Sequence, residues 1–93
     1  MKTRVTNLFQ LENGPRFALC GDFLGAKVTV VTGYAVAHDG WMNHVFVKWP
    51  GEAEQRLGDL PSKTAFRNQQ DAYEAGFRRG EVHVESARRP ARP

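Results

Sequence analysis

A hairpin-like stretch at residues 26–51 constrains the fold of this chain more than any other feature. Its sequence, AKVTVVTGYAVAHDGWMNHVFVKWPG, alternates residues on either side of Asp39-Gly40. Alternation with a period of two is the pattern of a strand that buries one face, and Asp-Gly is a strong signal for a two-residue hairpin turn. The stretch therefore predicts two long antiparallel strands joined at residues 38–41.

Both faces of the second strand in this hairpin are partly apolar. One face carries Val45, Val47 and Trp49, and the other carries Met42, His44 and Phe46. This pattern is typical of a central strand that is covered on two sides. We therefore expect barrel closure on one side and a helix or a partner on the other. In the first strand, Gly33 predicts a bulge or a sharp bend.

The remaining segments predict further strands and a single helix. Ser62 is a good N-cap, Phe66, Tyr73 and Phe77 fall on one apolar stripe, and Gly80 suits the residue just after a helix. The expected elements are strands at 4–11, 16–20 and 81–85, a loop at 21–25, a helix at 62–79, and either a helical turn or an edge strand within 52–60.

Length and charge indicate one small domain with a basic tail. A chain of 93 residues buries only about 60 to 65% of the surface that its unfolded form exposes. The net charge of +3 comes from Arg88, Arg89 and Arg92, because residues 1–86 hold ten basic and ten acidic side chains. We predict a globular domain at 1–86 and a disordered tail at 87–93.

The sequence also indicates a cytoplasmic protein. Its beginning, MKTRVTNLFQ, lacks the apolar region of a signal peptide, and no apolar run is long enough for a membrane helix. One cysteine, Cys20, cannot form a disulfide within the chain, which is consistent with a reducing compartment.

Residue patterns for catalysis or metal binding are weak. A two-residue turn at Asp39-Gly40 places His38 and His44 on opposite faces of the sheet, whereas a three-residue loop would bring them together as metal ligands. His83 is remote in sequence, and Cys20 has no nucleophile motif around it. We therefore expect no enzyme activity, no metal and no cofactor, with a metal- or cysteine-dependent enzyme as the least favoured alternative.

Aromatic and arginine residues suggest where the chain binds something. Exposed aromatic side chains on a small sheet act as anchors in protein interfaces or as stacking platforms for nucleic-acid bases. Adjacent arginines supply contacts for phosphates. The candidate binding residues are Trp41, Tyr34, His44, Phe46, Arg78 and Arg79.

The stretch GAKVTVVTGYAVAHDGWMNHVFVKWPG, followed by Asp59-Leu60, resembles the strand-turn-strand core of small SH3-like barrels. The resemblance covers about a third of the chain and implies a fold but no functional residue. We predict an α+β domain, either a strongly bent antiparallel sheet or an open SH3-like barrel of about five strands, with the helix at 62–79 packed on it.

Two binding functions follow from these patterns. The preferred one is a non-enzymatic module, an adaptor, regulator or inhibitor, that binds a protein partner through its aromatic hairpin. The alternative is a nucleic-acid-binding protein that uses the aromatic residues together with Arg78, Arg79 and the basic tail. No membrane partner is expected, and the predicted edge strand at 81–85 is where a dimer would pair.

Overall fold

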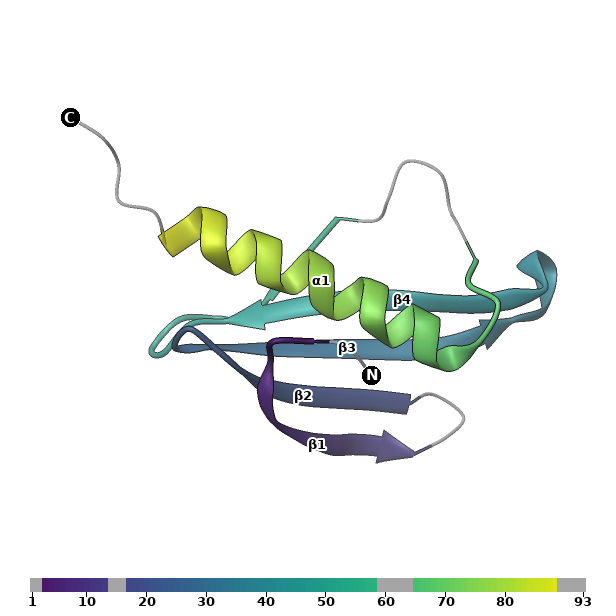
Figure 1. The fold of residues 1–93 in the computed structure, drawn as a ribbon, viewed down its shortest axis with the longest axis horizontal. Helices are drawn as coiled ribbons and strands as arrows, with labels where there is room; N and C mark the ends of the chain where they lie inside the picture. Colours follow the sequence, from purple (N-terminus) through teal and green to yellow (C-terminus); the bar gives the residue numbers. More distant parts are fainter. Residues whose placement is uncertain (1–2, 14–16, 59–64, 89–93) are drawn as a thin grey trace.

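Five strands and one long helix make up the part of the chain that the structure describes (Figure 1). The structure is a computed structural model, and it describes residues 3–13, 17–58 and 65–88. The elements in chain order are β1 (Thr6–Asn13), β2 (Phe17–Phe23), β3 (Ala26–Ala35), the single 3-10 turn η1 (Val36–His38), β4 (Gly40–Lys48), β5 (Gln55–Arg56) and α1 (Gln69–Arg88).

The strands form one antiparallel sheet in the order β1-β2-β3-β4-β5, so each strand pairs with its neighbours in sequence. The sheet is not closed, since β1 and β5 lie at its two edges. α1 lies across one face of the sheet (Figure 1). The predicted α+β class with about five antiparallel strands is therefore confirmed, whereas the SH3-like arrangement stays a prediction.

The central hairpin has the predicted faces but a different turn. Val28 pairs with Val47 and Val30 with Val45, and all four are fully buried beneath α1. The loop has four residues rather than two, because η1 is followed by Asp39 in the left-handed region at φ 49° and Gly40 then pairs with Ala35 as a strand residue. Asp39 of the Asp-Gly pair supplies the positive φ that the chain needs here, whereas Gly40 belongs to β4.

The bulge predicted at Gly33 is wrong. The pairing of β3 with β4 runs without a shift through Gly33 and Met42. The irregularities lie in β1 instead, between Thr6 and Phe9 and between Gln10 and Glu12, and Asn7 there has φ 55°. These bulges explain why the sequence of β1 does not alternate cleanly.

The loop predicted at 21–25 is mostly strand. β2 continues to Phe23, which is buried, and the turn to β3 consists only of Leu24 and Gly25, with φ of 49° and 86°. Two positive φ angles in succession form the tight turn that matches the twist of a hairpin. The edge-strand alternative for 52–60 is confirmed by β5, which pairs Gln55 with Val47.

The helix begins and ends later than the sequence predicts. α1 begins after Asn68, whose Oδ1 accepts a hydrogen bond from the Asp71 backbone N–H at 2.8 Å, so Asn68 caps it. Phe66 lies before the helix and its backbone pairs with Trp41. The expected cap Ser62 lies outside the described residues.

The strand predicted at 81–85 is wrong, because α1 continues through these residues to Arg88. A dimer that pairs through this segment as an edge strand is therefore excluded. Residues 89–93 of the predicted tail lie outside the described residues.

Two glycines explain why the helix does not stop at Gly80. Gly76 and Gly80 face β3, and a Cβ atom on them would lie 2.6 Å from Val30 Cγ1 and 2.5 Å from Val28 Cγ1, respectively. The absence of side chains lets the helix backbone approach the sheet closely. Gly80 therefore belongs to the packed face of α1, and tertiary contact outweighs its weak helix propensity.

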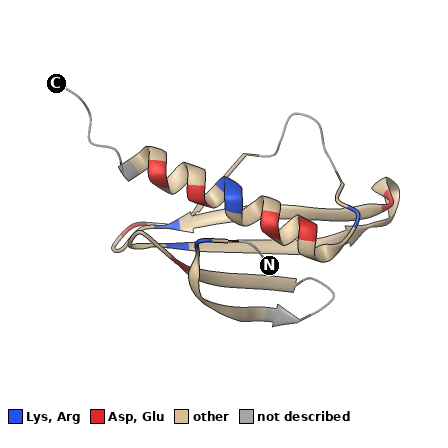
Figure 2. Ribbon diagram, viewed as in Figure 1, with Lys and Arg blue, Asp and Glu red and all other residues tan. Residues whose placement is uncertain are grey.

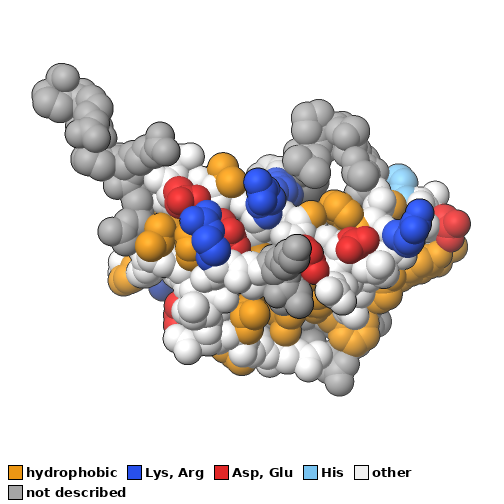
Figure 3. Space-filling view, viewed as in Figure 1, with side chains coloured by type: hydrophobic (Ala, Val, Ile, Leu, Met, Phe, Trp, Pro, Cys, Tyr) orange, Lys and Arg blue, Asp and Glu red, His pale blue; other side chains and the backbone are white. Residues whose placement is uncertain are grey.

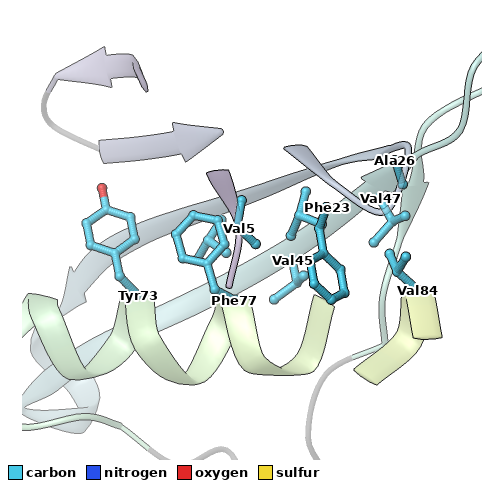
Figure 4. Packing of buried hydrophobic residues seen from close by; sticks show 10 residues of the cluster. Val5, Phe23, Ala26, Val45, Val47, Tyr73, Phe77 and Val84 are labelled. Carbon is cyan, nitrogen blue, oxygen red and sulfur yellow. The ribbon is translucent and has the colours of Figure 1, made fainter. Parts of the chain in front are cut away.

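The core lies between α1 and the sheet (Figure 4). Tyr73 and Phe77 project from the helix toward the sheet with their rings stacked at 6.4 Å, and Val84 continues this face. The predicted packing by Tyr73 and Phe77 is confirmed.

The segment at residues 3–5 binds the C-terminal half of α1. Val5 is buried in the core, and the carboxylate of Glu81 accepts hydrogen bonds from the Thr3 hydroxyl at 2.5 Å, from the Arg4 backbone N–H at 2.9 Å and from Arg4 Nε at 3.2 Å. Arg4 also forms an ion pair with Glu85. These contacts join the two ends of the described chain on the helix side of the sheet.

Candidate functional site

The six predicted binding residues occupy three separate places. Tyr34 and Trp41 form a cross-strand pair at the β3–β4 tip on the helix-facing side, whereas His44 and Phe46 lie on the opposite face of the sheet. Arg78 and Arg79 are on α1. The structure therefore does not bring the six together into one site.

The aromatic cluster at the hairpin tip is partly used by the fold. The Trp41 ring lies 6.3 Å from Phe17 and 5.8 Å from Tyr34 between centroids, and its backbone pairs with Phe66 in both directions. Tyr34 is half exposed, and its hydroxyl donates to Asp39 Oδ1 at 2.5 Å, which raises the pKa of Tyr34. Trp41 is thus mainly a packing residue, and the exposed large hydrophobic side chains of the tip are Tyr34 and Val36.

The two helix arginines differ in their surroundings. Arg79 donates to the backbone carbonyl of Gly58 and so connects α1 to the segment after β5. Arg78 is exposed and carries no hydrogen bond or ion pair to any described residue. Around them, α1 carries Asp71, Glu74, Glu81 and Glu85, and acidic and basic side chains are interspersed over the helix (Figures 2 and 3).

The face of the sheet opposite α1 has no described element packed on it, and we call it the uncovered face. Its centre is a row of side chains that crosses all five strands: Phe9, Cys20, Thr29, Phe46 and Arg56. Cys20 and Thr29 are small and buried between larger neighbours, whereas Phe46 is half-buried and Phe9 is 46% exposed. The Phe46 ring is therefore larger and more exposed than Cys20 and Thr29, the residues beside it near the middle of the sheet.

Two nitrogen-bearing side chains adjoin Phe46. Arg56 lies opposite Phe46 on β5, and its guanidinium donates to His44 Nδ1 at 2.9 Å. Because arginine can only donate, His44 accepts through Nδ1, and the proton of the neutral ring is then on Nε2. His44, Phe46, Arg56 and Val31 line a shallow hollow of about 290 Å³.

The next row on the uncovered face is basic. Lys27 and Lys48 pair directly across β3 and β4, and Asp22 lies opposite Lys27 on β2. The Lys27 ammonium is 2.9 Å from Asp22 Oδ1, which raises the pKa of Lys27 and, together with a hydrogen bond from Asn7, lowers the pKa of Asp22. Figure 2 marks basic positions at this end of the sheet.

On β2 to β5 the described charge of this face is therefore predominantly positive. On β2, β3, β4 and β5 its described side chains include Lys27, Lys48 and Arg56 and a single acid, Asp22. Residues 1–86 are neutral in composition, so the composition does not reveal that basic side chains gather on this face. Most of the acids lie elsewhere, four of them on α1.

Sequence reasoning found Phe46 and His44 but not the cations beside them. Lys27 and Lys48 are far apart in sequence, at the outer ends of the central hairpin, and only the register pairs them. If the loop length were known, counting residues outward from the turn would give the pairing of Lys27 with Lys48. Arg56 lies on a two-residue strand, which periodicity cannot identify.

The described residues contain no cluster of metal-binding side chains and no membrane-spanning helix. No three His, Cys, Asp or Glu side chains within residues 3–13, 17–58 and 65–88 gather closely enough to hold a metal ion. The expected two-residue turn that separated His38 from His44 is replaced by the four-residue loop, with His38 exposed in η1. In the same part of the chain, no helix combines the length and apolar character needed to span a bilayer.

No protein-family model, curated protein or solved structure matches this chain.

Proposed function

We propose that the protein binds single-stranded nucleic acid on the uncovered face of its sheet. The observation that carries the proposal is the position of Phe46, a partly exposed ring on a central strand with Lys48, Lys27 and Arg56 around it. An aromatic side chain gives a base a surface on which to stack, and the cations attract the phosphates.

The open sheet suits a single strand better than a duplex. Unpaired bases can turn toward the sheet and stack, whereas bases in a duplex are already stacked on each other. The face is broad and shallow, and charge complementarity favours a polyanion over a neutral protein surface. Of the six binding residues predicted from the sequence, this proposal retains Phe46 and His44. It assigns the phosphate contacts to cations of the sheet rather than to Arg78 and Arg79 on α1.

Fluorescence anisotropy with labelled oligothymidylate and oligouridylate tests the proposal. We expect binding by the purified protein that weakens steeply between about 50 and about 200 mM salt. Phe46→Leu keeps an apolar side chain but removes the aromatic ring, and it should lower the affinity about 5-fold to 150-fold, since stacking contributes about 1–3 kcal/mol per base.

Tyr34→Leu is the matched control, because it removes an exposed aromatic ring from the tip on the other side of the sheet. It should leave the affinity unchanged. If Tyr34→Leu lost affinity and Phe46→Leu did not, the oligonucleotide would bind at the hairpin tip rather than on the uncovered face. Absence of binding by the wild type at low salt would refute the proposal.

The tip supports a second candidate function, the binding of a protein partner. Val36 is 84% exposed and Tyr34 is 51% exposed, so an apolar and an aromatic side chain stand together at the end of the hairpin. A defined partner that is retained by the wild type and by Phe46→Leu, but lost by Val36→Asp, would support this function. Equal loss with both variants would contradict a separate site at the tip.

A further inference from the structure

We infer that Lys27 and Lys48 form the phosphate subsite of the uncovered face, so that a nucleotide binds with its phosphate beside these two lysines and its base on Phe46. This inference rests on the proposed function and assigns the attraction of the phosphate to these two lysines. It also predicts the smallest ligand that occupies the whole site, a nucleoside monophosphate.

The first argument is the charge imbalance in this row. Like charges directly opposite each other on neighbouring strands destabilise a sheet, and Lys27 and Lys48 are such a pair. Asp22 is the acid in the row, and it already binds both Lys27 at 2.9 Å and Asn7 at 3.0 Å. Lys48 forms no ion pair with any described residue, so its ammonium group is available to a bound anion.

The second argument is shape. Lys27 and Lys48 line a hollow of about 350 Å³ at the end of the sheet, and its other walls are Asp22, Gly25, Trp49 and Pro50. Gly25 and Pro50 belong to the adjoining turns, so backbone as well as the two lysine side chains lines the hollow. A phosphate group fits in this volume, and both lysines are among the residues that line it.

The third argument is the distance to the stacking ring. Phe46 and Lys48 are two residues apart on β4 and so project from the same face, separated by about 7 Å along the strand. This spacing is close to the separation between the phosphate and the base of one nucleotide. Arg56, on the far side of Phe46, is then placed near the next phosphate of a longer strand.

The two subsites can be separated by nuclear magnetic resonance with three small probes. Adenosine monophosphate should shift the signals of Phe46 and of the Lys27–Lys48 row together. Adenosine should shift Phe46 alone, and inorganic phosphate should shift the lysine row alone. Shifts from inorganic phosphate centred on Arg56 or Arg78, with the lysine row unaffected, would overturn the assignment.

Charge variants test the same subsite with an oligonucleotide. Lys48→Gln should weaken binding of oligothymidylate and lower the slope of log affinity against log salt by about 0.7, the value for one phosphate contact on a single strand. Asp22→Asn removes the competing acid and should strengthen binding. Arg78→Gln changes the net charge by the same amount as Lys48→Gln but lies on α1, so its slope should match the wild type.

The outcomes distinguish the inference from the proposed function. If Phe46→Leu loses affinity while Lys48→Gln and Arg78→Gln both keep the wild-type slope, the phosphate subsite is wrong and the stacking interface stands. Equal loss of slope in Lys48→Gln and Arg78→Gln would show a nonspecific charge effect and overturn the subsite. If the wild type binds no oligonucleotide, both proposals fall.

Discussion

Glu81 shows how one buried carboxylate connects distant parts of this chain. It is 7% exposed, and burial alone raises its pKa. The hydrogen bonds from Thr3 and Arg4 lower the pKa by more, so the folded-state value lies below the usual 4.5. The ionised form of Glu81 is therefore the one that the fold stabilises.

This residue predicts a pH dependence of stability. A carboxylate with a depressed folded-state pKa stabilises the protein fully above its unfolded pKa, and the contribution disappears as the pH falls through the folded-state pKa. We expect the free energy of unfolding to fall as the pH drops below about 4.5, the unfolded value of this group. Urea denaturation at a series of pH values measures this change.

Glu81→Gln is the informative variant for this prediction. Glutamine can still accept from Thr3 or Arg4 but does not titrate near this pH. The variant should be less stable than the wild type at neutral pH and should show a smaller loss of stability in acid. An unchanged acid dependence in Glu81→Gln would assign the effect to other carboxylates.

At the scale of elements, the contact between α1 and β3 depends on the missing side chains of Gly76 and Gly80. Alanine improves helix propensity over glycine by about 1 kcal/mol, so Gly80→Ala would stabilise an exposed helix. Here the new Cβ would lie 2.5 Å from Val28 Cγ1, and Val28 is fully buried. We expect a net loss of stability, because overpacking a core costs about 1–3 kcal/mol. Chemical denaturation measures the difference.

Gly58→Ala provides the control for this prediction. A Cβ at Gly58 meets no atom within 4 Å, so this variant should unfold within about 0.5 kcal/mol of the wild type. Combining Gly80→Ala with Val28→Ala should reduce the cost of the glycine substitution, since the second change makes room for the first. A Gly80→Ala protein more stable than the wild type would contradict the close contact.

The elements differ in how far the sequence predicts them. The central hairpin is predictable because Val28, Val30, Val45 and Val47 alternate on either side of a turn signal. The end of α1 is not, because Gly80 looks like a helix stop and the next residues alternate like a strand. Contact with Val28 and the hydrogen bonds to Glu81 decide in favour of helix, and both involve residues far away in sequence.

The candidate site is predictable in part for the same reason. Phe46 could be proposed from the two-sided apolar pattern of β4. The association of Lys27 with Lys48 depends on a register that is fixed by Asp39, whose left-handed conformation lengthens the loop. Pattern and propensity do not determine loop length, so the cations beside Phe46 could not be assigned from the sequence.

At the scale of the whole molecule, one core is shared by nearly all elements. α1 packs on β3 and β4, Val5 brings the N-terminal segment into the same cluster, and Phe23 adds β2. No described part has a core of its own. The domain should therefore unfold in a single cooperative step.

The two tryptophans test this cooperativity. Trp41 lies at one end of β4, and Trp49 lies just beyond the other end and packs against the core. Fluorescence of Trp41→Phe and Trp49→Phe therefore reports on opposite ends of the sheet. In each variant the transition should coincide with that from far-ultraviolet circular dichroism. A fluorescence transition that precedes the loss of helix at one end would contradict a single step.

The contacts of Glu81 with Thr3 and Arg4 also bear on how the chain folds during synthesis. α1 follows all five strands in sequence, yet it covers Val28, Val30, Val45 and Val47 and holds the segment at residues 3–5, which precedes β1. Until the ribosome has made and released α1, the strands have no cover for their apolar side. We expect the domain to fold after translation of α1 rather than strand by strand, which leaves the emerging sheet dependent on chaperones.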